Sequence, residues 1–104
     1  MKKLTNNVKI GGKHYSIEVS DNISLGRVNC SAEIDYEQLT ITVAEQAKEK
    51  MEADLMHEIM HGIYFHLGYR EHNEKEIDEL ASAFYMVIKD NPDLFVNMAE
   101  GKEK

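Results

Sequence analysis

Residues 57 to 61 read His-Glu-Ile-Met-His, an HExxH motif whose residue types and spacing suit metal-assisted hydrolysis. Four residues advance an α-helix by about 400°, so His57 and His61 project from nearly the same face, one turn apart. Neutral imidazole is a zinc ligand, and both rings can then reach one ion. Glu58 lies about 100° further round the helix, which places its carboxylate beside the ion instead of on it. We therefore predict a zinc cofactor held by His57 and His61, with Glu58 as the catalytic base that activates a zinc-bound water.

A catalytic zinc site needs a third protein ligand and one open position. The long metzincin form of the motif requires a Gly at position 64 and a His at position 67, where this chain has Tyr64 and Leu67. The remaining choice is a carboxylate from the following helix, where Glu74 and Asp78 stand four residues apart on one face. In such a pair one carboxylate binds zinc. The other accepts a hydrogen bond from the far nitrogen of a ligating histidine and fixes its tautomer.

Spacing alone leaves the place of the third ligand open. If the two helices form an antiparallel hairpin, the residue level with His61 lies nearer Asp78 or Glu79 than Glu74. A change of crossing angle shifts this by a turn. The further candidates for the third ligand are Glu71, His66 and His72.

Three tyrosines near the motif or on the second helix could offer a hydroxyl to a tetrahedral oxyanion: Tyr64, Tyr69 and Tyr85. Their spacing favours none of them. A place at the boundary of the core explains each tyrosine more simply.

Alternating apolar residues predict a small antiparallel sheet of three or four strands in the N-terminal half of the chain. Residues 8–10 and 15–19 alternate on either side of Gly11-Gly12, the pattern of a tight hairpin. A second alternation sets residues 32–36 opposite residues 39–43, with Glu37-Gln38 at the turn.

Helical periodicity takes over after residue 51. Six apolar residues recur at three- and four-residue steps and predict a long helix that packs on the sheet: Leu55, Met56, Ile59, Met60, Ile63 and Leu67. Gly68 marks its end, and the capping-box pair Thr42 and Glu45 suggests a start near residue 45. His and Glu also meet at this spacing by chance on surface helices. Here the motif lies beside an apolar stripe, at the edge of the core, which favours a metal site.

A second helix follows, beginning at the capping-box pair Asn73 and Glu76. Its predicted core stripe is Ile77, Leu80, Ala81, Phe84 and Ile88. Pro92 suits the first turn of a short terminal helix that carries Leu94, Phe95 and Met98.

Length and composition limit the classes of protein that the chain can represent. Its 104 residues predict a single domain, residues 1–104. The net charge of −7, with no basic stripe, disfavours a nucleic-acid partner. No apolar run has the length of a signal peptide or a membrane span, so we expect no membrane association. Cys30 is the one cysteine, which excludes an intrachain disulfide and predicts a cytoplasmic location.

The motif and its surroundings resemble a known group of proteins. The resemblance covers roughly residues 30 to 95 and is carried by Leu55–Gly62, Glu74 to Asp78, Leu80-Ala81 and Lys89-Asp90-Asn91-Pro92. These segments look like small prophage-encoded metallopeptidase-like proteins of Gram-positive bacteria, similar to the ImmA/IrrE metallo-endopeptidases and to minimal gluzincins.

This resemblance bears on the third ligand and on the substrate. The family's second helix carries a Glu-x-x-Ala-Asn-x-Phe-Ala pattern whose Glu binds the metal, which implies Glu74 as the third ligand. Ile77 and Leu80 depart from that pattern, standing for Ala and Phe. Because family members of the ImmA kind act on repressors of phages or mobile elements, the resemblance also implies a regulatory protein substrate.

The sequence thus predicts an α+β, zincin-like domain in which a small antiparallel sheet packs on the HExxH helix. A second helix completes the zinc site, and a short C-terminal helix follows. We expect zinc-dependent hydrolysis of peptide bonds, with an extended substrate docking on the outer strand. The alternatives are a latent or inactive metallopeptidase-like protein that acts as an interaction module, and a module whose zinc is structural or absent.

Overall fold

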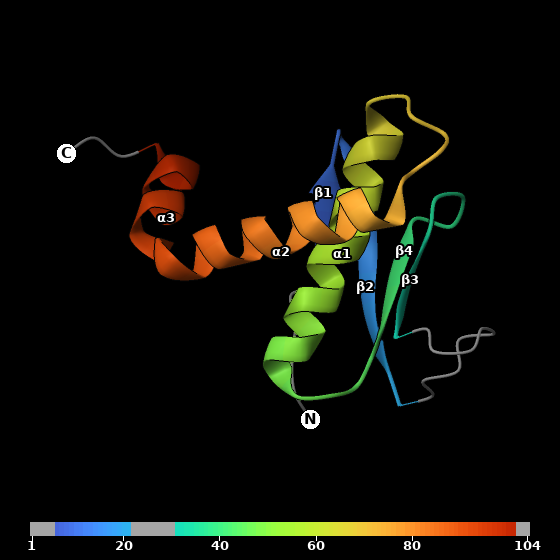
Figure 1. Cartoon of the computed structure of the whole chain (residues 1–104), viewed down its shortest axis with the longest axis horizontal. Helices are drawn as coiled ribbons and strands as arrows, with labels where there is room; N and C mark the ends of the chain where they lie inside the picture. The colour runs from blue at the N-terminus through green and yellow to red at the C-terminus, as the bar shows by residue number, and fades with distance from the viewer. Residues whose placement is uncertain (1–5, 22–30, 102–104) are drawn as a thin grey trace.

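The computed structural model describes residues 6–21 and 31–101, which form a four-stranded sheet and three helices (Figure 1). In chain order the elements are β1 (Asn7–Ile10), β2 (Lys13–Ser20), β3 (Ala32–Asp35), β4 (Thr40–Ala44), α1 (Lys48–His66), α2 (Glu74–Asp90) and α3 (Pro92–Glu100). The strands follow the order β1-β2-β4-β3 across the sheet. The predicted α+β class is therefore confirmed. Cys30 lies outside the described residues.

Both predicted hairpins are present. Gly11 and Gly12 join β1 to β2 with φ angles of 58° and 87°. A two-residue turn requires these left-handed values, and glycine adopts them without steric cost. In the second hairpin, Oδ1 of Asp35 accepts hydrogen bonds from the backbone N–H groups of Glu37 and Gln38, at 3.0 and 2.9 Å. This turn sets β3 antiparallel to β4.

The sheet is mixed, so the prediction of a purely antiparallel sheet was wrong for one pairing. β2 and β4 run parallel, with Ile17 opposite Ile41 and Val19 opposite Val43. The second hairpin joins the sheet through its returning strand, so β4 lies between β2 and β3. Ile41 and Val43 are consequently fully buried at the centre of the sheet. Side chains alternate with the same period in both kinds of pairing, so the sequence pattern could not distinguish them.

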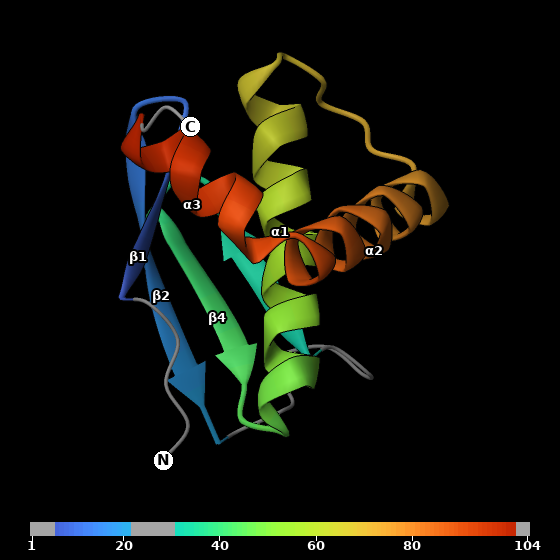
Figure 2. The ribbon, with the colours of Figure 1, turned by 90° about the vertical axis from the view of Figure 1, so that its left-hand side faces the viewer.

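α1 lies against one face of the sheet, and α2 packs on the side of α1 that faces away from the sheet (Figures 1 and 2). On the sheet side, Leu55, Ile59 and Ile63 pack against a buried cluster made of Ile10, Tyr15, Ile41, Val43 and Met51. Gly62 allows a close approach there, since a Cβ on it would lie 2.8 Å from Cδ1 of Ile10. The HExxH helix is therefore held tightly on the sheet.

The prediction was wrong for the N-terminal cap of α1 and correct for its C-terminal end. Ala47 is the N-cap and makes no side-chain capping hydrogen bond, so the predicted capping box of Thr42 and Glu45 was wrong. Thr42 instead lies inside β4, where the hydrogen bonds of the sheet hold its backbone. The predicted stop was correct, because α1 ends at His66 and Gly68 follows with a φ of 101°.

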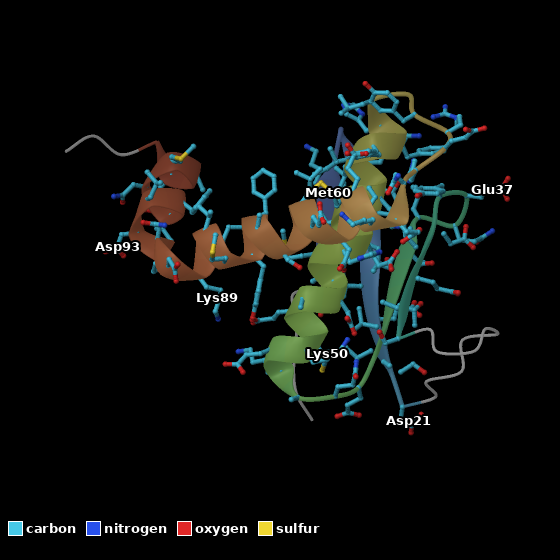
Figure 3. All side chains as sticks on the ribbon, viewed as in Figure 1. Asp21, Glu37, Lys50, Met60, Lys89 and Asp93 are labelled. Atoms are coloured by element: carbon cyan, nitrogen blue, oxygen red, sulfur yellow. The ribbon has the colours of Figure 1, made fainter. Side chains whose placement is uncertain are left out.

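α2 begins as predicted. The Asn73 side chain accepts a hydrogen bond from the backbone N–H of Glu76 at 3.0 Å. Ile77 and Ala81 are buried against Met60 of α1, which is labelled in Figure 3 where the two helices cross. The first half of α2 is therefore fixed on α1.

The second half of α2 and the whole of α3 project beyond the sheet and α1 (Figure 1). Leu80 and Phe84 are 37% and 48% exposed, so their predicted place in the core was wrong. α2 crosses α1 steeply, so its buried residues, Ile77 and Ala81, lie in its first half. Further along α2, Tyr85 still contacts α1 through a hydrogen bond to Glu52. Pro92 starts α3 as predicted. Within the described residues, no helix combines the length and the apolar character that a membrane crossing requires.

Candidate metal centre

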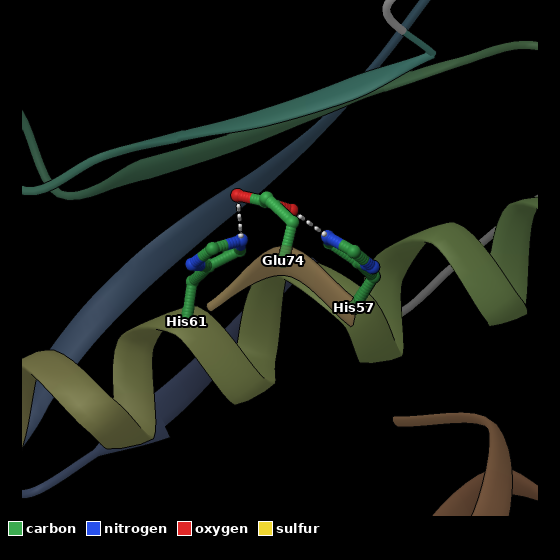
Figure 4. Close-up of side chains that lie close together, drawn as sticks. All are labelled: His57, His61 and Glu74. Carbon is green, nitrogen blue, oxygen red and sulfur yellow. Dashed lines mark hydrogen bonds and ion pairs between the residues drawn. The ribbon is translucent and has the colours of Figure 1, made fainter. Parts of the chain in front are cut away.

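The two histidines of the motif and the first residue of α2 converge on one point (Figure 4). His57 and His61 lie one turn apart on α1, with ring centroids 5.0 Å apart. The Glu74 carboxylate reaches both rings: Oε1 is 3.2 Å from Nε2 of His57, and Oε2 is 3.1 Å from Nε2 of His61. One ligand atom from each residue lies within 4.8 Å of the others. The three side chains are therefore close enough to hold a metal ion.

The crossing of the helices decides which acid reaches the histidines. An antiparallel hairpin would have brought Asp78 or Glu79 level with His61. Instead α2 runs across α1, and the packing of Ile77 against α1 holds the first turn of α2 over the motif. Glu74 therefore reaches both rings, while Glu79 forms an ion pair along α2.

Asp78 lies at the other nitrogen of His57. Its Oδ1 is 3.4 Å from Nδ1 of His57, the ring atom opposite the one that faces Glu74. Asp78 follows Glu74 by one helical turn, so both carboxylates approach His57 from the same face of α2. An ionised carboxylate only accepts hydrogen bonds, so Asp78 favours the His57 tautomer with its proton on Nδ1. Without a metal, Glu74 at 3.2 Å from Nε2 favours the other tautomer. If a metal takes the place of that contact, the proton on Nδ1 leaves the lone pair on Nε2 for the ion.

His61 has a different neighbour at its second nitrogen. Its Nδ1 lies 2.7 Å from Nδ1 of His72, and Nε2 of His72 lies 2.9 Å from the carbonyl oxygen of Tyr69. His72 was a candidate third ligand, but it contacts the nitrogen of His61 opposite the one that faces Glu74. Burial lowers the pKa of His61 below its ordinary value, and the charge of Glu74 opposes this effect. Burial thus favours the neutral ring, the form that binds metal.

Two further candidates for the third ligand lie away from this group. The His66 ring covers the β1–β2 turn so closely that a Cβ on Gly11 would collide with it. Glu71 is exposed in the link between α1 and α2. Neither residue belongs to the group of ligand atoms that the described residues bring together.

Glu58 is a charged residue that is buried, with 8% of its surface exposed. Its carboxylate is not part of the ligand group. Burial and then the charge of Glu58 raise the pKa of Tyr36 to about 12, with smaller effects from Tyr15 and Glu74. Glu58 therefore lies beside the ligand group, on the side of α1 where Tyr36 packs.

Tyr36 lies near the site, although residue spacing did not indicate it as a site residue. Its ring stacks on that of Phe65, with centroids 4.1 Å apart and planes inclined by 8°. Phe65 follows His61 by one helical turn and Glu58 by two, so this stack lies over the face of α1 that carries both. No spacing rule links Tyr36 to the motif, because the contact depends on how the sheet packs on the helix.

The three tyrosines that the sequence did single out lie elsewhere. The Tyr85 hydroxyl donates a hydrogen bond to Glu52 at 2.8 Å. Tyr69 is 58% exposed. The Tyr64 ring meets the His72 ring edge-on, with centroids 5.5 Å apart.

The group of His57, His61 and Glu74 fits zinc in the chemistry of its ligand atoms. Two imidazole nitrogens and a carboxylate are ordinary zinc ligands. Zinc bonds of about 2.0–2.2 Å at tetrahedral angles separate neighbouring ligand atoms by about 3.3–3.6 Å. The two contacts from Glu74, at 3.2 and 3.1 Å, come from different carboxylate oxygens, and one ligand atom from each residue lies within 4.8 Å of the others. The three ligand atoms are therefore near enough to share one ion once the side chains draw together around it.

No family model, curated protein or solved structure matches the chain.

Proposed function

We propose that the chain is a zinc-dependent metallopeptidase of the gluzincin type, with His57, His61 and Glu74 as the metal ligands. The observation that carries this proposal is the convergence of these three side chains, with ligand atoms within 4.8 Å of one another. Three protein ligands leave the fourth position of a tetrahedral zinc open for solvent or substrate, as catalysis requires. Asp78 supports the arrangement by favouring the lone pair on Nε2 of His57.

Each residue then has a definite task. When bound, zinc supplies Lewis acidity that polarises a carbonyl group and lowers the pKa of water toward about 7. Glu58 accepts a proton from the attacking water, and its burial keeps competing solvent away from the carboxylate. The Tyr36 hydroxyl keeps its proton at working pH, because its pKa is about 12. It can therefore donate a hydrogen bond to the developing oxyanion.

The outer strand β3 is where we place an extended substrate. β3 ends the sheet next to α1, and Figure 4 shows the sheet passing over the Glu74 carboxylate. A peptide lying along this side would bring its backbone past the three ligands. The proposed substrate class is a protein with an accessible extended segment, such as a regulatory protein of a phage or mobile element.

Two measurements test the proposal together. Protein purified without added zinc should contain the metal, and it should cleave a casein-like substrate. The Glu58→Gln variant keeps the volume of the buried side chain, so it should retain zinc while its cleavage rate falls by about 10²–10⁴-fold. Glu79→Gln on the exposed side of α2 is the matched control and should cleave at the normal rate. Zinc-loaded protein that never cleaves would reject the catalytic proposal.

A latent or inactive metallopeptidase-like interaction module is the alternative function, and exposed apolar residues favour it. Seven large apolar side chains of α2 and α3 are at least 37% exposed: Leu80, Phe84, Met86, Val87, Leu94, Val96 and Met98. Large exposed apolar patches are rare on monomeric proteins and often mark sites where another molecule binds. Retained zinc without cleavage, in both the unmodified protein and Glu58→Gln, would favour this alternative.

A further inference from the structure

A chain of hydrogen bonds lies behind the metal-facing nitrogen of His61. Nδ1 of His61 is 2.7 Å from Nδ1 of His72, and Nε2 of His72 is 2.9 Å from the Tyr69 carbonyl oxygen. The two imidazole planes are inclined by only 23°. At this separation the two ring nitrogens cannot both present lone pairs, because those would repel one another. One proton must therefore lie between the rings.

The Tyr69 carbonyl decides which ring supplies that proton. A carbonyl oxygen only accepts hydrogen bonds, so Nε2 of His72 must be the donor to it. A neutral His72 then has its lone pair on Nδ1, and His61 must donate from its own Nδ1. This leaves the lone pair of His61 on Nε2, which lies 3.1 Å from Oε2 of Glu74. The order of acceptors thus selects the tautomer that a metal ligand needs.

When no metal is bound, Glu74 favours the other tautomer of His61, with the proton on Nε2. Its carboxylate would accept an N–H from Nε2 of His61, and a proton there would block the ligating lone pair. However, the Glu74 side chain is 71% exposed, so water can satisfy its oxygens. The His61 side chain is only 12% exposed, and its contact with His72 is the shorter of the two. The contact with His72 should therefore prevail.

We propose that His72 is a positioning residue that holds His61 as the Nδ1–H tautomer, with its Nε2 lone pair directed at Glu74. The consequence for catalysis rests on the proposed function, since the tautomer matters there only if His61 binds zinc. His72 would then serve His61 as Asp78 serves His57. Each motif histidine would then have an acceptor at Nδ1, although at His57 the contact with Glu74, at 3.2 Å, is shorter than the contact with Asp78, at 3.4 Å.

Nitrogen-15 NMR of the imidazoles tests the tautomer directly on metal-free protein. At about pH 8 an imidazole of ordinary pKa is neutral, and its two tautomers have distinct nitrogen shifts. The unmodified protein should show His61 with its proton on Nδ1. His72→Leu removes the acceptor, so His61 should change to the Nε2–H form facing Glu74. His72→Asn places an acceptor oxygen at the δ1 position and should restore the Nδ1–H form. His14→Leu, at an exposed strand residue, is the control.

Zinc affinity provides the second readout. His72→Leu should bind zinc about 10–100-fold more weakly, whereas His72→Asn should stay within about threefold of the unmodified protein. An Nε2–H signal for His61 in the unmodified protein, or full zinc affinity in His72→Leu, would overturn the proposal. Failure of the unmodified protein to bind zinc, with the Nδ1–H signal present, would reject the metallopeptidase function and still uphold the role of His72.

Discussion

Replacing Asp78 with alanine should weaken zinc binding about tenfold without abolishing it. Oδ1 of Asp78 lies 3.4 Å from Nδ1 of His57, longer than the about 2.7–3.2 Å of a good N–H···O bond. The Asp78 side chain is also 72% exposed, so solvent and salt screen its charge. Partners of ligating histidines contribute about 10–100-fold to metal affinity, and these two facts indicate the lower end. A tenfold loss corresponds to about 1.4 kcal/mol of binding free energy.

Competitive titration of zinc against a chromophoric chelator would measure this loss in Asp78→Ala. Glu74→Ala should lose more than about 100-fold, because it removes a ligand where Asp78→Ala removes only a hydrogen-bond acceptor. Glu79→Ala is the matched control, since Glu79 pairs with Lys75 at 2.8 Å on the same helix and should leave affinity unchanged. Equal losses in Asp78→Ala and Glu74→Ala would show that Asp78 is itself a ligand. An unchanged affinity in Asp78→Ala would refute its proposed role at His57.

Three further predictions follow from the packing and the electrostatics around the site. Tyr36→Phe should lower kcat by about 10²–10³-fold with KM little changed, since the hydroxyl would act on the oxyanion; a change in KM alone would contradict this. Spectrophotometric titration should find that Tyr36 and Tyr85 ionise with a pKa of about 12. Folding raises both pKa values above the ordinary value of about 10. The free energy of unfolding should therefore be constant below pH 10 and fall as the pH rises toward 12. Ile77→Ala should destabilise the fold by about 2–5 kcal/mol in chemical unfolding, and it should weaken zinc binding through Glu74 in a zinc titration. Leu94→Ala, at an exposed residue, should change neither measurement.

The local elements of the fold could be predicted because short-range patterns determine them. Gly11-Gly12 specifies the first hairpin, and Asn73 specifies the start of α2 through its own hydrogen bond. The parallel pairing of β2 with β4 could not be predicted, because it depends on which strand of the second hairpin joins the sheet. The exposure of Phe84 was missed for a similar reason: a helical stripe does not show where its packing partner ends.

The candidate site also has one part that residue spacing predicts and another that depends on how the elements pack. Helical geometry alone placed His57 and His61 on one face of α1. The choice between Glu74 and Asp78 depended on the angle at which α2 crosses α1, which residue spacing does not contain. Tyr36 lies near the site because the sheet packs on α1, where its ring stacks on Phe65, and no sequence motif spans that separation. Sequence reasoning therefore predicts a site within one helix more reliably than its contributions from other elements.

X-ray absorption at the zinc edge of zinc-loaded protein would identify the atoms that bind the ion, and so would test the proposed ligands themselves. We predict two imidazoles at about 2.0–2.1 Å, from His57 and His61, together with oxygen neighbours at about 2.0–2.2 Å. Glu74→Ala should alter only the oxygen contribution. A single imidazole at the zinc, or three with His72 recruited as a ligand, would contradict the proposed site.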